Sequence, residues 1–330
     1  MDQIITHLDG SKTGYNDYGG NGYAVIICHG GPGSRIISKN IVEQATLDGL
    51  RLIGIDRPGY GLSTLKPGRE IADCSPDALA VVDALGIDQF LACGISTGGA
   101  YAFALAVYAG PTRCTGVVTG CAMTDMSWIP ARTSMYINLG LEEIYNAKTR
   151  EEAMKLGQKM IGPGIRDHKN AVERKTTGQK MEPIGIWDMM KIMQHGGTNP
   201  ITGHSMEKNQ MGWADIKSMW QRSKDPDSIQ SGAARYANGV EAYVDDRIAD
   251  GKGWHSFDIK KVVVPVTIVH GGKDTIVPVI AARHTKSLLP HADLRIFPEC
   301  GHVSVMDLTI DACREMRLVV VNGGARKSKM

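Results

Sequence analysis

The chain has 330 residues, of which 42% are hydrophobic and 22% charged, which excludes a disordered or collagen-like protein. Its 37 Lys and Arg nearly balance 35 Asp and Glu, without the basic excess that is usual in proteins dedicated to binding nucleic acid. The seven cysteines form no C-x-x-C pair, so we expect free thiols in a reducing compartment rather than a zinc ribbon or a disulfide framework.

The ends of the chain bear on its location. The first residues lack the charged start and apolar stretch of a signal peptide, and no run approaches the roughly eighteen apolar residues of a membrane span. We therefore expect a soluble, cytoplasmic protein. The last three residues, Ser328-Lys329-Met330, resemble the S-K-L peroxisomal address and predict import into peroxisomes if the source is a eukaryote. The sequence gives no prediction of the oligomeric state.

The first third of the chain alternates between strand-like and helix-like segments. Apolar runs at 23–28, 50–55, 90–95 and 116–122 have the length of buried parallel strands. Helix-length segments separate them: one begins at Ser75-Pro76-Asp77 and stops at Gly86, and another covers 99–109. This alternation predicts a mostly parallel, doubly wound α/β sheet.

The alternation stops after Asp125. Residues 125–254 contain helix-like stretches, at 141–160 and 225–249, and strand character returns at 262–270 and 294–297. We therefore predict an α/β core formed by 1–124 and 255–330, with 125–254 inserted as a helical cap.

Twelve of the sixteen methionines lie between 123 and 219, and those that face a cleft would form an apolar pocket. The acidic pairs at 142–143 and 245–246 are interpreted as solvated helix faces.

A nucleophile is predicted at Ser96. The segment Gly94-Ile95-Ser96-Thr97-Gly98 matches the G-x-S-x-G elbow, in which small residues allow a sharp turn that exposes the serine hydroxyl. A strand-like run leads directly into Ser96 and a helix-prone segment follows. The alternative is a structural or phosphate-binding turn.

An activated serine needs a base, and the base needs an orienting carboxylate. His302 and Asp274 each follow a strand-like run and lie 28 residues apart, which leaves room for one helix and one strand between them. The order Ser, Asp, His is that of α/β hydrolases. Asp125, which follows the strand after the elbow, is the alternative acid.

Two further glycine-rich turns follow strands. The loop His29-Gly30-Gly31-Pro32-Gly33 frees backbone N–H groups for an oxyanion hole, and the turn from Asp56 to Ser63 is interpreted as structural. The sequence contains no H-E-x-x-H, Walker or EF-hand motif, so no metal and no cofactor are predicted.

Together these motifs resemble the α/β-hydrolase superfamily over residues 23–317. The HGGPG loop is most similar to that of proline iminopeptidases and related esterases, and the resemblance implies that Gly31 and Thr97 supply the oxyanion-hole N–H groups. Those peptidases usually carry Gly-Gly-Ser-Trp-Gly at the elbow, whereas Ile95 and Thr97 flank the serine here. Epoxide hydrolases and haloalkane dehalogenases place Asp at the nucleophile position, which Ser96 argues against.

The resulting hypothesis is a cofactor-independent serine hydrolase that cleaves an apolar carboxylic ester or lactone through an acyl-enzyme on Ser96. One alternative is an aminopeptidase of the proline iminopeptidase type. It would need carboxylates of the cap to bind the free amine of its substrate, and the candidates are Glu142, Glu143, Glu151 and Glu152. Another alternative, from a different class, is a receptor that binds a small ligand on the same fold without catalysis.

Overall fold

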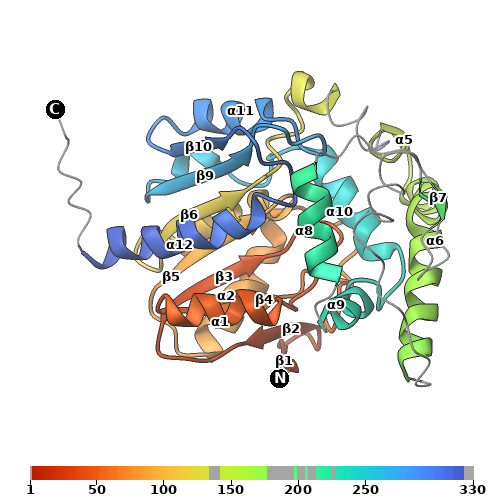
Figure 1. The fold of residues 1–330 in the computed structure, drawn as a ribbon, viewed down its shortest axis with the longest axis horizontal. Helices are drawn as coiled ribbons and strands as arrows, with labels where there is room; N and C mark the ends of the chain where they lie inside the picture. Colours follow the sequence, from red (N-terminus) through yellow and green to blue (C-terminus); the bar gives the residue numbers. More distant parts are fainter. Residues whose placement is uncertain are drawn as a thin grey trace.

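The computed structural model describes residues 2–133, 142–176, 197–198, 205–206, 213–223 and 227–322. An eight-stranded sheet in the order β1-β2-β4-β3-β5-β6-β9-β10 forms its centre (Figure 1). The strands are β1 (Asp2–Thr6), β2 (Lys12–Asp17), β3 (Tyr23–Cys28), β4 (Leu50–Ile55), β5 (Phe90–Ile95), β6 (Cys114–Gly120), β9 (Val266–Gly271) and β10 (Asp293–Phe297). The six strands from β4 to β10 in this order are parallel, whereas β1 and β2 pair antiparallel.

Helices cover both faces of the sheet because successive side chains of each buried strand point to opposite sides. On β3, Ala24 and Ile26 pack with α2 (Ser75–Ala84), α3 (Gly98–Ala109) and α11 (Ile280–Leu288). The intervening Val25 and Ile27 pack with α1 (Lys39–Leu47) and α12 (Met306–Val321). This arrangement confirms the predicted doubly wound α/β fold.

The predicted strands at 23–28, 50–55 and 90–95 coincide with β3, β4 and β5. The run at 262–270 becomes a strand only from Val266, because the 3₁₀ turn Ile259–Lys261 and Pro265 precede it. The sequence analysis did not predict β1 and β2. They lie at the edge of the sheet, and the largely exposed side chains of β1 give it no apolar signature.

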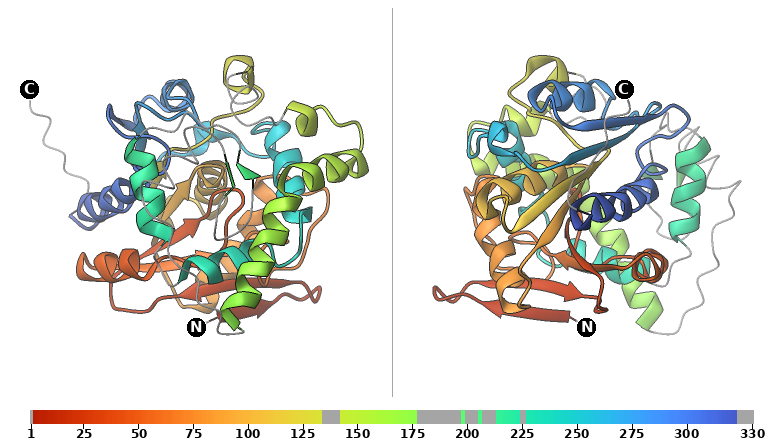
Figure 2. Two further views of the ribbon diagram at one scale, coloured as in Figure 1. Left: turned by 45° about the vertical axis from the view of Figure 1, so that its right-hand side comes forward. Right: turned by 90° about the vertical axis from the view of Figure 1, so that its left-hand side faces the viewer.

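Strands β6 and β9 are neighbours in the sheet, and the described part of the chain between them is mostly helical; residues 125–254 are called the insertion below. Its described elements are α5 (Glu142–Tyr145), α6 (Arg150–Thr176), α8 (Trp213–Ser223), α9 (Asp227–Arg235), α10 (Glu241–Gly251) and the short pair β7 (Gly197–Thr198) and β8 (Ser205–Met206). Helices α5, α6, α9 and α10 group on one side of the sheet, and α8 lies beside α12 (Figures 1 and 2). A carboxylate oxygen of Asp125 accepts the N–H of Trp254 at 3.1 Å, which joins the two ends of the insertion.

One interpretation of the insertion is wrong. Asp245 and Asp246 were expected on a solvated face, but both side chains are buried in α10. Each is paired with arginine, Asp245 with Arg150 and Asp246 with Arg57. The helix turns this acidic pair toward the core because two guanidinium groups, the buried Arg57 and the half-buried Arg150, compensate the lost hydration.

None of the helices in the described ranges has the length and apolar character needed to cross a membrane. The tail Ser328-Lys329-Met330 lies outside the described residues.

Candidate active site

Ser96 lies in the sharp turn between β5 and α3. Its φ is +55°, a left-handed conformation that is uncommon for residues other than glycine. The turn depends on its glycines, since a Cβ on Gly94 would collide with the backbone at Gly98, and one on Gly98 would collide with the carbonyl of Cys28. The strand–turn–helix setting of a nucleophile elbow is therefore present around Ser96.

His302 lies between Ser96 and Asp274, although the three residues come from distant parts of the chain. Its Nε2 is 3.2 Å from Ser96 Oγ, and its Nδ1 is 2.8 Å from Asp274 Oδ2. The other oxygen of Asp274 accepts the N–H groups of Ile276 and Val277 at 2.9 and 2.8 Å. The structure therefore brings together the three residues predicted for the catalytic triad, because β5, β9 and β10 end at the same edge of the sheet.

Asp125, the alternative acid, has different partners. Its Oδ1 accepts the N–H groups of Ser127 at 2.9 Å and Trp254 at 3.1 Å. The carboxylate that contacts His302 is that of Asp274, and Asp125 instead closes the base of the insertion.

The HGGPG loop packs against the elbow. A Cβ on Gly30 would lie 3.3 Å from the Cβ of Ser96, and one on Gly31 would lie 3.0 Å from Thr97 Oγ1. In the described part of the chain, the backbone N–H groups of Gly31 and Thr97 donate to no other residue. The two predicted donors thus lie side by side, next to the serine and without a competing acceptor.

Arg57 links the HGGPG loop to helix α10 of the insertion. The Arg57 guanidinium donates to the carbonyl of His29 and, at 3.1 Å, to that of Gly30, and it pairs with Asp246 on α10 at 2.6 Å. Burial would raise the pKa of Asp246, but Arg57 and Arg69 outweigh it and hold that pKa far below its usual range. Burial and then the charge of Arg57 lower the pKa of His29 well below its ordinary value, so His29 is neutral.

Two residues of the insertion that the sequence analysis missed also reach the site. On α10, Arg247 is 2.8 Å from Thr97 Oγ1 and 2.7 Å from Asp250, and it therefore lies beside the predicted oxyanion hole. Burial raises the pKa of Asp250 to about 6 in spite of this arginine. On α8, Asp215 accepts the backbone N–H of His302 at 2.8 Å. No local pattern in the sequence marks Asp215, because its burial depends on the loop at His302.

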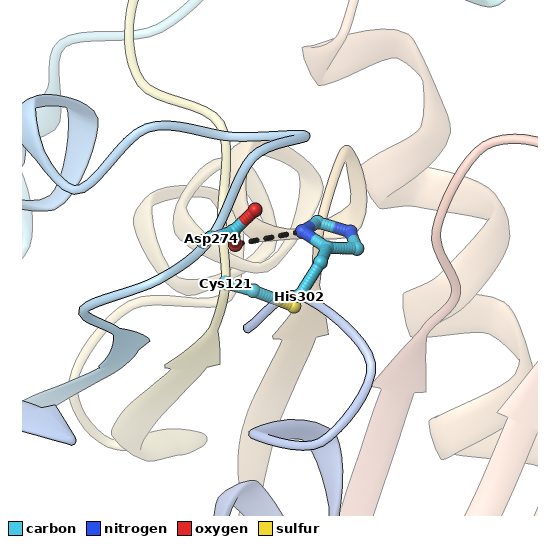
Figure 3. Close-up of side chains that lie close together, drawn as sticks. All are labelled: Cys121, Asp274 and His302. Atoms are coloured by element: carbon cyan, nitrogen blue, oxygen red, sulfur yellow. Dashed lines mark hydrogen bonds and ion pairs between the residues drawn. The ribbon is translucent and has the colours of Figure 1, made fainter. Parts of the chain in front are cut away.

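A thiol completes the surroundings of His302. Cys121, which follows β6 with a φ of +43°, lies with its sulfur beside Asp274 and His302 (Figure 3). Burial would lower the pKa of His302, but the Cys121 sulfur and the Asp274 carboxylate both favour the imidazolium and hold this pKa well above its ordinary value.

The same three side chains form the one group of possible metal ligands among the described residues, with donor atoms within 4.8 Å of one another. Nδ1 of His302 and Oδ2 of Asp274 already share a hydrogen bond, so a metal ion would have to displace that proton. This competition favours the triad over a metal centre.

The glutamates considered for binding a substrate amine lie elsewhere. Glu142, Glu143, Glu151 and Glu152 are all exposed, and Glu151 pairs with Lys155 on the surface of α6. Among the described acidic residues of the insertion that approach the site, Asp246 and Asp250 are buried and paired with arginine, and the Asp215 carboxylate accepts backbone N–H groups of the His302 loop.

Comparison with known proteins agrees with this fold. The chain belongs to the α/β-hydrolase fold family, whose model matches residues 23–138 and 161–308. It is 22% identical over 301 residues to a non-heme haloperoxidase of Rhodococcus erythropolis, an alignment that covers 91% of this chain and 92% of the relative. It is 23% identical to a pimeloyl-[acyl-carrier protein] methyl ester esterase of Nitrosomonas europaea, covering 86% and 90%.

Solved structures show the same fold at low sequence identity. A thermophilic esterase from Thermogutta terrifontis superimposes with a TM-score of 0.61 at 16% identity, covering 98% of both chains. An esterase from Exiguobacterium antarcticum gives a TM-score of 0.58 at 19% identity, covering 97% of this chain and 100% of that one.

Proposed function

We propose that the protein is a serine hydrolase that cleaves a carboxylic ester or lactone, without a cofactor, through an acyl-enzyme on Ser96. The observation that carries this proposal is the position of His302, whose ring nitrogens contact Ser96 Oγ at 3.2 Å and Asp274 Oδ2 at 2.8 Å. A base that contacts both a hydroxyl and a carboxylate is the arrangement that activates serine for acyl transfer.

In the first half of the reaction, Ser96 Oγ bonds to the substrate carbonyl carbon while its proton passes to Nε2 of His302. The carboxylate of Asp274 keeps the other ring proton on Nδ1 and stabilises the imidazolium. The N–H groups of Gly31 and Thr97 bind the oxyanion, a contribution of about 3 kcal/mol per donor in comparable sites.

The intermediate then collapses. The bond to the alkoxide oxygen breaks, and the leaving alcohol takes the proton from Nε2, which leaves an ester on Ser96. In the second half, water gives a proton to His302 and its oxygen bonds to the acyl carbon. Release of the carboxylic acid returns the proton to Ser96.

Named relatives give this proposal further support. One curated relative and two of the solved structures are esterases by name. At this low sequence identity, the likeness itself establishes only that the fold is shared. The four glutamates considered for binding an amine are all exposed in the described structure, which gives the aminopeptidase less support than the esterase. We further propose that the insertion acts as the cap that sets substrate choice.

Two measurements on the purified protein test the proposal. A fluorophosphonate should label Ser96, as located by peptide mapping, and the label should be lost in Ser96→Ala. A panel of p-nitrophenyl acetate, p-nitrophenyl octanoate, a δ-lactone and a prolyl arylamide should then show turnover of the esters or the lactone. Faster cleavage of the arylamide would favour the aminopeptidase, and binding of these compounds without labelling or turnover would favour a receptor.

A further inference from the structure

A cavity of about 470 Å³ opens beside Ser96, between the HGGPG loop and helices α1, α8, α9 and α12. Gly30 and Ile95 line it. Ile95 directly precedes Ser96, and a Cβ on Gly30 would lie 3.3 Å from that of Ser96. The cavity therefore reaches the two residues that flank the serine in space and in sequence, and its volume is in the range of small-molecule sites.

Most of the cavity wall is aliphatic. The aliphatic side chains come from β3, the segment before α1, and helices α1, α8 and α12: Ile27, Ile36, Ile37, Ile41, Met219 and Met306. Such a wall stabilises a hydrocarbon chain, because burying it removes apolar surface from water. Methionine at two of these positions lets the wall adapt to the shape of that chain.

Two arginines interrupt this apolar wall. Arg222 on α8 and Arg235 on α9 both line the cavity, and the Nε of each is buried without a hydrogen-bond partner among the described residues. A buried donor without an acceptor is unfavourable, and an acceptor that reaches it recovers this loss. Both arginines line the cavity, so a ligand that binds there would meet two guanidinium groups.

The charges around these arginines support an anionic ligand. Arg222 pairs through Nη2 with Asp307 at 2.7 Å, but that carboxylate is 62% exposed and is therefore a weak, hydrated partner. Arg235 forms no ion pair with any carboxylate of the described ranges. Arg235 lines the same cavity as His29 and Gly30, so its side chain lies near the HGGPG loop.

We propose that this cavity binds an ester whose apolar chain ends in a carboxylate, with Arg222 and Arg235 at the charged end. The planar guanidinium matches a carboxylate in geometry and charge, whereas the aliphatic wall accepts the intervening chain. The inference rests on the proposed ester hydrolysis and names its substrate class. The reaction that supplies the substrate must therefore leave one carboxyl group of the molecule free.

Matched esters test this substrate class. For a chain on the acyl side of the ester, mono-p-nitrophenyl suberate is compared with p-nitrophenyl octanoate. For a chain on the alcohol side, 6-acetoxyhexanoate is compared with hexyl acetate. We expect one carboxylated ester to exceed its neutral partner by about tenfold or more in kcat/KM, the size of effect expected from a charge-assisted hydrogen bond.

Variants assign the preference to the arginines. Arg235→Gln and Arg222→Gln should each lower the ratio of the two kcat/KM values, mainly through KM for the carboxylated ester, and Arg235→Lys should retain part of it. Arg113→Gln is the control, since Arg113 pairs with Asp83 beyond the opposite ends of the parallel strands. This variant should keep the wild-type ratio.

The outcomes separate the two proposals. If no ester of either kind is hydrolysed, the proposed function is wrong. If the neutral esters are hydrolysed and the carboxylated ones are not preferred, the function stands and this inference is overturned. A preference that survives in both glutamine variants also overturns it. If those variants do not fold, the wild-type comparison of matched esters still decides.

Discussion

The carboxylate of Asp215, on helix α8 of the insertion, accepts a 2.8 Å hydrogen bond from the backbone N–H of His302. Its other oxygen accepts the N–H groups of Val303 at 3.1 Å and Ser304 at 2.9 Å, and the Ser304 hydroxyl at 2.7 Å. A Cβ on Gly301 would collide with this carboxylate. The insertion thus holds the backbone of the loop that carries the imidazole.

This contact predicts that Asp215→Asn lowers the kcat of ester hydrolysis by roughly 10- to 100-fold, because the amide places an N–H₂ donor against backbone donors and misaligns His302. KM should change much less. Asp245→Asn is the matched control, since Asp245 is another buried carboxylate of the insertion but pairs with Arg150. Steady-state kinetics and melting temperature should be measured for both. Equal losses of kcat in the two variants would show that the effect is general destabilisation.

The backbone conformation at Ser96 predicts that Ser96→Gly is more stable than Ser96→Ala, although both variants lack the hydroxyl. At a φ of +55°, glycine relieves steric strain that alanine retains. Ser96→Gly should therefore exceed Ser96→Ala in free energy of unfolding by about 1 kcal/mol, as measured by urea denaturation. Both variants should lack ester hydrolysis. A Gly variant no more stable than the Ala variant would argue against the strained elbow.

The contacts of the two candidate acids predict which substitution lowers turnover more. Asp274→Asn should reduce turnover by about 10⁴-fold, because the amide favours the wrong tautomer of His302. Asp125→Asn should reduce it far less and act mainly on stability, since its carboxylate binds the N–H groups of Ser127 and Trp254. Rates of ester hydrolysis and melting temperatures check this ranking. The reverse order would transfer the acid role to Asp125.

The environment of His302 predicts the pH dependence of kcat/KM. His302 must be unprotonated to accept the serine proton, so activity should rise with pH through its pKa, which lies well above the ordinary value for histidine. Cys121→Ala removes one of the two groups that raise this pKa and should move the acidic limb of the profile to lower pH. Cys114→Ala, at the other end of β6, is the matched buried control. An unchanged limb in Cys121→Ala would exclude the thiol as a cause.

Much of the α/β core could be predicted because its signals are local. Strand β5 is a buried apolar run, and the glycines around Ser96 are required by a turn that only small side chains can form. His302 and Asp274 were identifiable because each follows a strand, and the carboxyl ends of parallel strands meet at one edge of a sheet. Thus the fold class and each member of the candidate triad follow from local patterns, a strand-like run and the turn after it.

The contribution of the insertion to the site followed only from the folded chain. In the sequence, Asp246 and Asp215 resemble ordinary acidic residues of amphipathic helices. Their burial depends on partners distant in the sequence, which are Arg57 for Asp246 and the backbone at His302 for Asp215. Likewise, Arg222 and Arg235 form a candidate binding site only because the fold places them beside aliphatic residues of other elements. A charge is tolerated in a core only where packing supplies its counter-charge or hydrogen bonds, and that depends on the three-dimensional arrangement rather than on any local pattern.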